Sequence, residues 1–169
     1  MDVFEAVKTM LAVRSYKKDP IPSEIISRIV EAGRLTASAM NRQHWDFVVI
    51  QDRQTLQRLG KLASTGGYIA GAPLTIAVAV PDSFLGHIDG ARAAQDMMLV
   101  AWQAGVGSNW VGKVNTPEIK ELLYIPEDRI VLTVIPFGYP ADEVGRIAKD
   151  RKPLSEVAHA ERYGTSYQS

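Results

Sequence analysis

The chain has 169 residues, of which 46% are hydrophobic and 22% are charged, and its 19 basic residues equal its 19 acidic residues. This is the size and balance of one globular unit, so we expect a single domain over residues 1–169 rather than a disordered or membrane chain. The neutral charge excludes a general field for polyanions, so no nucleic-acid partner is expected, and the absence of cysteine excludes disulfides, thiolate metal sites and thiol nucleophiles.

The N-terminal segment does not have the pattern of a secretory signal. Asp2 and Glu5 are acidic, and no uninterrupted apolar stretch follows them. Nowhere does the sequence reach the roughly 18 to 20 consecutive apolar residues that a membrane span requires. We therefore expect a cytoplasmic protein without a membrane partner.

Two short amphipathic helices are predicted to open the chain. Apolar residues recur at helical spacing over residues 3–12, and Asp2 is placed to cap the first turn. The stretch 19–22 contains two prolines and cannot be helical, whereas Ser23 can cap a second helix whose last turns lie near Gly33.

The middle of the chain alternates strand and helix patterns. The β-branched stretch 47–50 predicts a buried strand, and leucines at helical spacing over 56–62 predict a helix after it. Residues 74–80 form the clearest strand pattern in the chain. Residues 88–104 are rich in Ala, Met and Leu, which predicts a helix buried on most sides, of the kind often found at a dimer interface.

The last third contains a glycine-rich turn, a helix and a final strand. We expect a turn with a short strand over 105–112, a helix that begins at Pro117 and a strand over 130–137. Because helices and strands alternate irregularly, the predicted fold is α+β, with a mixed central sheet flanked by helices. The polar tail 149–169 has little with which to build a core, so we expect it to lie on another surface, such as that of a partner subunit.

The usual catalytic motifs are missing. The histidines at 44, 87 and 159 do not have metal-binding spacing, and no Gly-x-Ser-x-Gly motif for a hydrolase is present. The Gly-x-Gly at 105–107 follows a predicted helix and enters a strand, which is the reverse of the order in a dinucleotide-binding fold. What remains is a set of polar residues in predicted loops.

Each of these polar residues has a structural interpretation beside the functional one. Taken singly, a residue such as Arg14 is more often part of a solvated surface than of a phosphate site, and Ser38 and Asn41 are more often turn or cap residues than ligands. Lys149 and Arg151, in the polar tail, can serve solubility alone.

Five motifs in the same order resemble those of the nitroreductase family, and the resemblance covers nearly the whole chain. The first helix of the family ends in Arg-Arg-Ser-x-Arg-x-(Phe/Tyr), and its next motif is Pro-Ser-Ser-x-Asn-x-Gln-Pro-Trp-x-Phe. Gly-x-Gly-(Ser/Thr)-x-Trp-x-Gly, Gly-Tyr-Pro-Ala and Arg-Lys-Pro-Leu follow. The corresponding segments here are 10–16, 37–47, 105–112, 138–141 and 151–154.

The resemblance implies an FMN-dependent homodimer whose cofactor sites are shared by two subunits, with the extended C-terminal tail packing on the partner. FMN needs cations for its phosphate, amide-type hydrogen bonds for its polar edge and a flat apolar slot for its ring. The implied cofactor-binding residues are Arg14, Lys149 and Arg151 at the phosphate, Ser38 and Asn41 at the polar edge with Gln43 in the same loop, and the backbone of Trp110, Val111 and Gly112 along the ring.

The implied reaction is a ping-pong transfer of electrons from NADH or NADPH through FMN to a nitroaromatic, quinone or similar acceptor. No catalytic acid, base or nucleophile is expected, and no metal site. The sequence departs from the family motif at Met10, Leu11 and Ala12, which replace the Arg-Arg-Ser anchors. It also departs at His44, which replaces a proline. We interpret His44 as an exposed loop residue in preference to a residue that lines the substrate slot. Two alternatives therefore stay open: a dimer of the same fold with weakened or lost FMN binding that acts as a non-redox ligand-binding module, and a structural dimer with a vestigial pocket.

Overall fold

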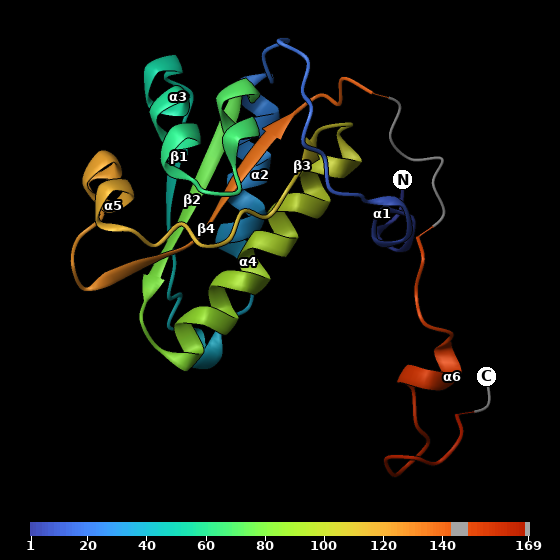
Figure 1. Ribbon diagram of the computed structural model, residues 1–169. Coiled ribbons are helices and arrows are strands. Elements are labelled where there is room, and N and C mark those ends of the chain that lie inside the picture. The colour runs from blue at the N-terminus through green and yellow to red at the C-terminus, as the bar shows by residue number, and fades with distance from the viewer. Residues whose placement is uncertain (143–148, 168–169) are drawn as a thin grey trace.

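The computed structural model describes residues 1–142 and 149–167, and its centre is a four-stranded sheet (Figure 1). The strand order is β1-β2-β4-β3, and every neighbouring pair is antiparallel. The bounds of the strands are Asp46–Ile50 (β1), Leu74–Pro81 (β2), Gly107–Ser108 (β3) and Arg129–Gly138 (β4). A parallel pairing occurs only as an isolated bridge between Ala12 and Ser108, within the described residues.

Helices cover both faces of this sheet, which confirms the predicted α+β class. One hydrophobic core joins the sheet to α2 and α4, and a second joins it to α3 and α5. The helices are α1 (Val3–Thr9), α2 (Ser23–Leu35), α3 (Arg53–Leu62), α4 (Phe84–Gln103), α5 (Pro117–Leu123) and α6 (Leu154–Val157), with 3₁₀ turns at Ala39–Asn41 (η1) and Gly67–Gly71 (η2).

The central strand β2 separates the two cores by simple alternation. Its even-numbered residues from Leu74 to Val80 belong to the core of α2 and α4, whereas Ala77 and Ala79 belong to the core of α3 and α5. Because both faces are covered, the strand is apolar at nearly every position. This is why its sequence pattern was the clearest in the chain.

Helix α1 ends at Thr9, three residues before the predicted end at residue 12. After the helix the chain joins the edge of the sheet, where the Val13 N–H donates to the Ser108 carbonyl at 2.9 Å. A second bridge pairs Tyr16 with Pro140. The segment 12–16 therefore lies along β3 and the end of β4.

Helix α4 begins at Phe84, earlier than the predicted start at residue 88, because the Ser83 side chain accepts a hydrogen bond from the Gly86 N–H at 3.1 Å. One side of the helix packs on the sheet and α2. The other side carries solvent-exposed residues, among them Phe84 and Ile88. In the single chain the helix is therefore buried on one side rather than on most sides.

The C-terminal segment 149–167 lies apart from the sheet and carries the short helix α6 (Figure 1). Leu154 and Val157 are more than half exposed, so the apolar side chains of this segment are not covered by the described part of the chain. That it packs on a partner subunit remains a prediction. In the part of the chain that the structure describes, no helix has the length and hydrophobicity needed to cross a membrane.

Candidate functional site

Arg14 is held at the sheet edge by the backbone on both sides of it. The Val13 N–H is bonded to Ser108, and the Ser15 carbonyl accepts the Ala141 N–H at 3.0 Å. Arg14 itself is exposed and lines a cavity of about 250 Å³ together with Ala12, Val13, Ser15, Pro140 and Asp142. The predicted cation is thus fixed by its backbone while its side chain remains available to a ligand.

A partly buried tyrosine supports this segment. The Tyr16 hydroxyl donates to the Val13 carbonyl at 2.5 Å, which ties the segment back on itself. Burial raises the pKa of the Tyr16 phenol far above its ordinary value, Tyr68 raises it further, and the nearby Arg14 guanidinium lowers it. Tyr16 therefore acts as a neutral hydrogen-bond donor.

The turn predicted to follow the flavin ring begins beside this segment. Asn109 is buried, and its side chain donates to the Tyr68 hydroxyl at 2.5 Å and to the Trp110 carbonyl at 3.2 Å. Val111 pairs with Val134, so both of its backbone groups are used inside the protein. Among the described residues, the backbone N–H groups of Trp110 and Gly112 have no partner.

Gly112 leaves open space where a side chain would begin. A Cβ placed there would approach no atom more closely than the Trp110 Nε1, at 3.8 Å, among the described residues. Packing inside the chain therefore does not require glycine at this position. Close approach of a flat ligand to the backbone would require it.

The second group of predicted residues lies in the loop 38–44, which folds tightly on itself. The Gln43 N–H donates to the Ser38 Oγ at 2.9 Å, and the Gln43 side chain reaches the Asn41 carbonyl at 3.3 Å. Met40, Asn41 and Gln43 have φ values of 52–53°, in the left-handed region. Since each such residue costs about 1 kcal/mol, the 38–44 loop needs support from outside.

That support comes from Asp89 on α4, a residue that the sequence prediction missed. Its carboxylate is 1% exposed, accepts the Ala39 N–H at 3.2 Å and lies 2.9 Å from the His44 Nδ1. The interpretation of His44 as an exposed loop residue is wrong, because its side chain is only 15% exposed and is paired with this carboxylate. A signal existed in the sequence: Asp89 falls at helical spacing with Gly86 and Ala93, on the stripe of α4 that packs inward.

The two groups lie at opposite ends of the sheet. Asp46, which follows the 38–44 loop, pairs near the C-terminal end of β2, whereas Gly107 pairs with Gly138, near the start of β2. Along α4, Asp89 and Gln103 are about 21 Å apart at 1.5 Å per residue. One chain therefore does not bring Arg14 and the 38–44 loop together around a single small ligand.

The two tail residues are separate from both groups. Lys149 donates through its Nζ to the Val7 carbonyl at 2.5 Å, at the end of α1, and Arg151 donates to the carbonyl of its neighbour Asp150 at 2.7 Å. Desolvation, together with the positive charge of Arg151, lowers the pKa of the Lys149 ammonium. Among the described residues, neither side chain lines the cavity beside Arg14.

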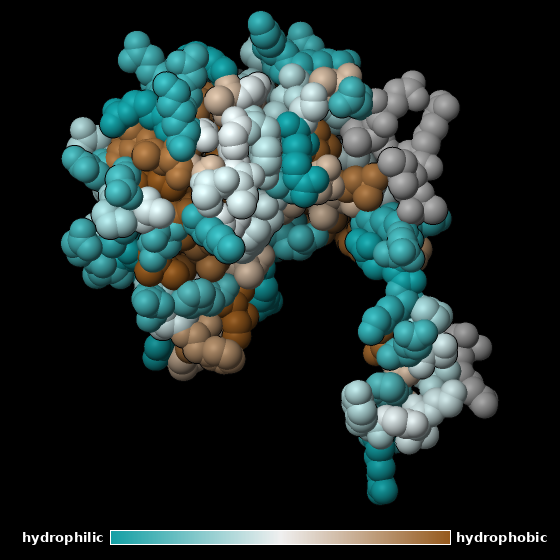
Figure 2. Space-filling model, in the orientation of Figure 1, coloured by the Kyte–Doolittle hydropathy of each residue, from teal (hydrophilic) through white to brown (hydrophobic). Residues whose placement is uncertain are grey.

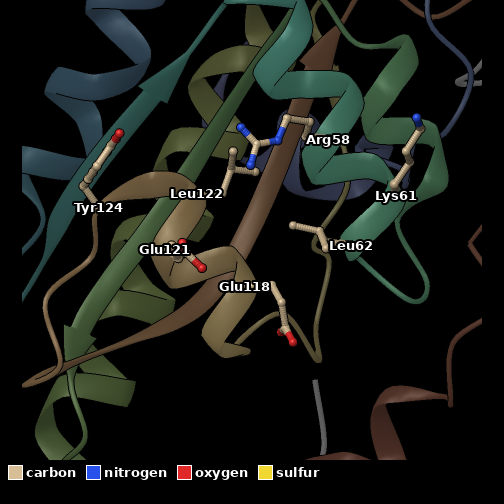
Figure 3. A pocket seen from close by; sticks show the side chains of 7 residues that line it. All are labelled: Arg58, Lys61, Leu62, Glu118, Glu121, Leu122 and Tyr124. Atoms are coloured by element: carbon tan, nitrogen blue, oxygen red, sulfur yellow. The ribbon is translucent and has the colours of Figure 1, made fainter.

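A larger groove of about 490 Å³ lies between α3 and α5, away from every predicted site residue. Figure 3 shows Arg58 and Lys61 from α3 on one side and Glu118 and Glu121 from α5 on the other, with Tyr124 beyond them. In Figure 2 hydrophobic residues appear in this region among hydrophilic ones. The groove has mixed charges, and none of its residues belongs to the motifs.

Over residues 1–142 and 149–167, no cluster of three or more acidic or histidine side chains suits a metal ion.

The comparison with known sequences gives one family and several relatives. The sequence model of the Nitroreductase family matches residues 11–75 and 65–139. A putative NADH dehydrogenase/NAD(P)H nitroreductase of Methanothermobacter thermautotrophicus is 34% identical over 155 residues, which is 86% of this chain and 81% of that protein. An FMN reductase (NAD(P)H) of Bacillus subtilis is 25% identical over 187 residues, which is 96% of this chain and 74% of the relative.

Solved structures share the fold. A putative NADH dehydrogenase/NAD(P)H nitroreductase of Bacteroides thetaiotaomicron aligns with a TM-score of 0.86 and 27% identity, over 95% of this chain and 98% of that one. The NADPH:FMN oxidoreductase of Vibrio harveyi, complexed with NAD⁺, aligns with a TM-score of 0.86 over 98% of this chain and 79% of the other. At 23% identity, the second likeness concerns the fold alone.

Proposed function

Because this chain belongs to the nitroreductase family, and is on that ground an NAD(P)H-dependent oxidoreductase that uses FMN, we propose that it works by a ping-pong mechanism. NAD(P)H would give up its hydride and leave as NAD(P)⁺ before a nitroaromatic, quinone or similar acceptor enters the same slot and takes up the two electrons. FMN supplies the redox chemistry between the two half-reactions. The protein binds, orients and shields the reactants, so no side chain is assigned as a catalytic acid or base.

The observation that carries the proposal is the open turn at 109–112. The N–H groups of Trp110 and Gly112 are unpaired within the described residues, and the space beside the Gly112 α-carbon is empty to 3.8 Å. A flat ring that accepts hydrogen bonds fits such a backbone. In this assignment Val111 contributes its position in the turn rather than a free N–H, since that group is bonded to Val134.

The phosphate end rests on Arg14. Its side chain lines a cavity, and the backbone around it is fixed by bonds to the sheet. The family's other anchors are replaced by residues with different uses: Met10 packs against the hydrophobic core, and Ala12 lines the cavity without a hydroxyl. We assign Lys149 and Arg151 as further phosphate ligands, in an arrangement completed by a second subunit.

A homodimer completes the site. The 38–44 loop, with Ser38, Asn41 and Gln43, lies at the far end of the sheet from Arg14, so we assign it to the cofactor bound mainly by the partner subunit. Helix α1 leaves Val3, Phe4 and Val7 exposed, at 76%, 73% and 49%. Together with the tail 149–167, this apolar face is the surface that we assign to the subunit interface.

One spectrum of the purified protein tests the proposal. Flavin absorption bands that are released as FMN on denaturation, followed by NAD(P)H oxidation that depends on a nitroaromatic or quinone, are the expected results. Stopped-flow reduction by NAD(P)H without the acceptor checks the ping-pong order. A protein that stays colourless after incubation with FMN would refute the proposal and favour the non-redox ligand-binding alternative, for which the loss of the anchors at 10–12 is the supporting observation.

A further inference from the structure

We propose that the buried carboxylate of Asp89 is a positioning residue, which fixes the 38–44 loop for the cofactor by holding both of its ends. The inference rests on the proposed function, because the loop is assigned to the polar edge of FMN. Asp89 itself lies beneath the loop on α4 and is 1% exposed, so it acts through the loop rather than on the cofactor.

The contacts of Asp89 bracket the part of the loop with an unfavourable backbone conformation. The Ala39 N–H donates to both carboxylate oxygens, at 3.2 and 3.3 Å, and the His44 Nδ1 lies 2.9 Å from Oδ2. Met40, Asn41 and Gln43, with their left-handed backbone, lie between these two contacts. One side chain therefore closes the loop from below.

Other hydrogen bonds of the loop cannot replace this anchor. The Asn41 N–H donates to the Ser38 carbonyl and the Gln43 N–H donates to the Ser38 hydroxyl, so both bonds join residues of the same loop. Within the described part of the chain, the hydrogen bonds that join the loop to another element all end on Asp89. Local bonds shape the loop, and Asp89 places it.

His44 and Asp89 depend on each other. A carboxylate removed from water is costly unless charged or polar groups face it, and the imidazole N–H of His44 is such a group. The family motif has proline at position 44, which carries no side-chain donor, so this closure is a property of this chain's own sequence.

Loss of the anchor releases the loop toward extended backbone conformations, which displaces Ser38 and Asn41. The cofactor is then bound less tightly and its polar edge is held differently. Both effects are measurable without turnover: the first as the FMN dissociation constant, and the second as the visible circular dichroism of the bound flavin.

The test compares Asp89→Ala, Asp89→Asn and His44→Ala with a matched control. Asp96→Asn removes another carboxylate on the same helix, one that accepts a 2.6 Å hydrogen bond from Thr36 outside the loop. We expect Asp89→Ala to raise the FMN dissociation constant about tenfold or more and to change the flavin dichroism. Asp89→Asn should have a smaller effect because its amide oxygen still accepts the Ala39 N–H, and Asp96→Asn should behave like the wild type.

Hydrogen exchange of the amides at 39–43 in the apoprotein separates the inference from the proposed function. If exchange is faster in Asp89→Asn but no variant binds FMN, the anchoring role of Asp89 is supported and the assignment of the loop to FMN is refuted. Wild-type FMN affinity, dichroism and exchange in both Asp89→Asn and His44→Ala would overturn the inference, even if Asp89→Ala does not fold. His44→Ala added to Asp89→Ala should cause no further loss, because the two side chains act as a pair.

Discussion

In the segment 10–16, where the family motif has three arginines and a serine, Arg14 is the one residue that keeps the motif's polar side chain. Its neighbours in the motif have become Met10, Leu11 and Ala12, none of which can bind a phosphate. The contribution of Arg14 to phosphate affinity is therefore expected to be unusually large in this protein.

Arg14→Ala should weaken FMN binding by about tenfold to a hundredfold, since one charge-assisted bond is worth roughly 1.5 to 3 kcal/mol. Riboflavin, which lacks the phosphate, should bind to the variant and to the wild type equally well. Fluorescence titration with both flavins measures the difference. Arg34→Ala is the control, because Arg34 is an exposed arginine paired with Glu31 on α2. Equal losses for FMN and riboflavin would contradict a phosphate role.

Gly112→Ala should weaken both flavins without destabilising the protein. The added methyl group fills space next to the backbone where the ring is assigned, while the closest atom of the protein, among the described residues, is 3.8 Å away. We expect an unchanged melting temperature and an FMN dissociation constant raised about tenfold. Gly71→Ala is the matched control, because a Cβ there meets no atom of the described residues within 4 Å. A variant that loses stability instead would show that Gly112 is structural.

At the residue scale, motifs in the sequence indicate some of the candidate site residues and not others. Arg14, Ser38 and Asn41 were predicted because motifs carry them in order along the chain, and their roles stay predictions. Asp89 was missed because its two contacts lie 45 and 50 residues away along the chain. Its helical spacing with Gly86 and Ala93 marks it as inward-facing but does not indicate those contacts. The separation of the motif residues into two distant groups was equally invisible, since spacing along a chain does not give distance across a sheet.

At the scale of elements, the edge of the sheet places Arg14. Gly107 in β3 lies against Val13 so closely that a Cβ there would come within 2.4 Å of a Val13 methyl group and 2.8 Å of its Cβ. The stiff, β-branched Val13 cannot rotate away easily. The glycine therefore allows the segment 12–16 to pack on the sheet.

Gly107→Ala should destabilise the protein by about 1 to 3 kcal/mol, as overpacking of a buried contact does. Denaturant unfolding measures this change. Because the same contact holds Arg14, FMN affinity should fall more than riboflavin affinity in the folded variant. Unchanged stability would mean that the sheet edge shifts without cost.

The elements themselves were largely predictable from hydrophobic periodicity. β2 was clear because both of its faces are buried, and α4 was clear because of its long inward stripe. The errors lay at the ends: α1 stops at Thr9 because the backbone after it bonds to Ser108, which is a tertiary contact rather than a local signal. The two-residue strand β3 likewise exists only through its pairing with β4.

At the scale of the whole molecule, the exposed face of α1 should be covered in solution. Phe4→Glu places a charge on that face and should raise the dimer dissociation constant at least about tenfold, because burial of a phenylalanine stabilises by roughly 1.5 to 3 kcal/mol. Sedimentation over a concentration series measures it. Tyr124→Glu, at a residue that is 94% exposed beside the groove between α3 and α5, should leave the dimer intact. An intact dimer in Phe4→Glu and a weakened dimer in Tyr124→Glu would indicate that the interface lies at that groove instead.

In the proposed homodimer, the distance between Arg14 and the 38–44 loop means that each active site needs residues from two chains, and this predicts complementation between variants. At an FMN concentration too low to load either variant, Arg14→Ala and Asn41→Ala should each be inactive alone, but a mixed dimer keeps one site in which both residues are native. If subunits exchange at random, half of the dimers are mixed, and a mixture of two inactive proteins should recover about a quarter of the native activity. A double variant with both changes in the same chain, mixed with the native protein, separates subunit exchange from simple dilution. Two inactive variants of this protein, each altered in a different half of the site, are therefore expected to complement each other.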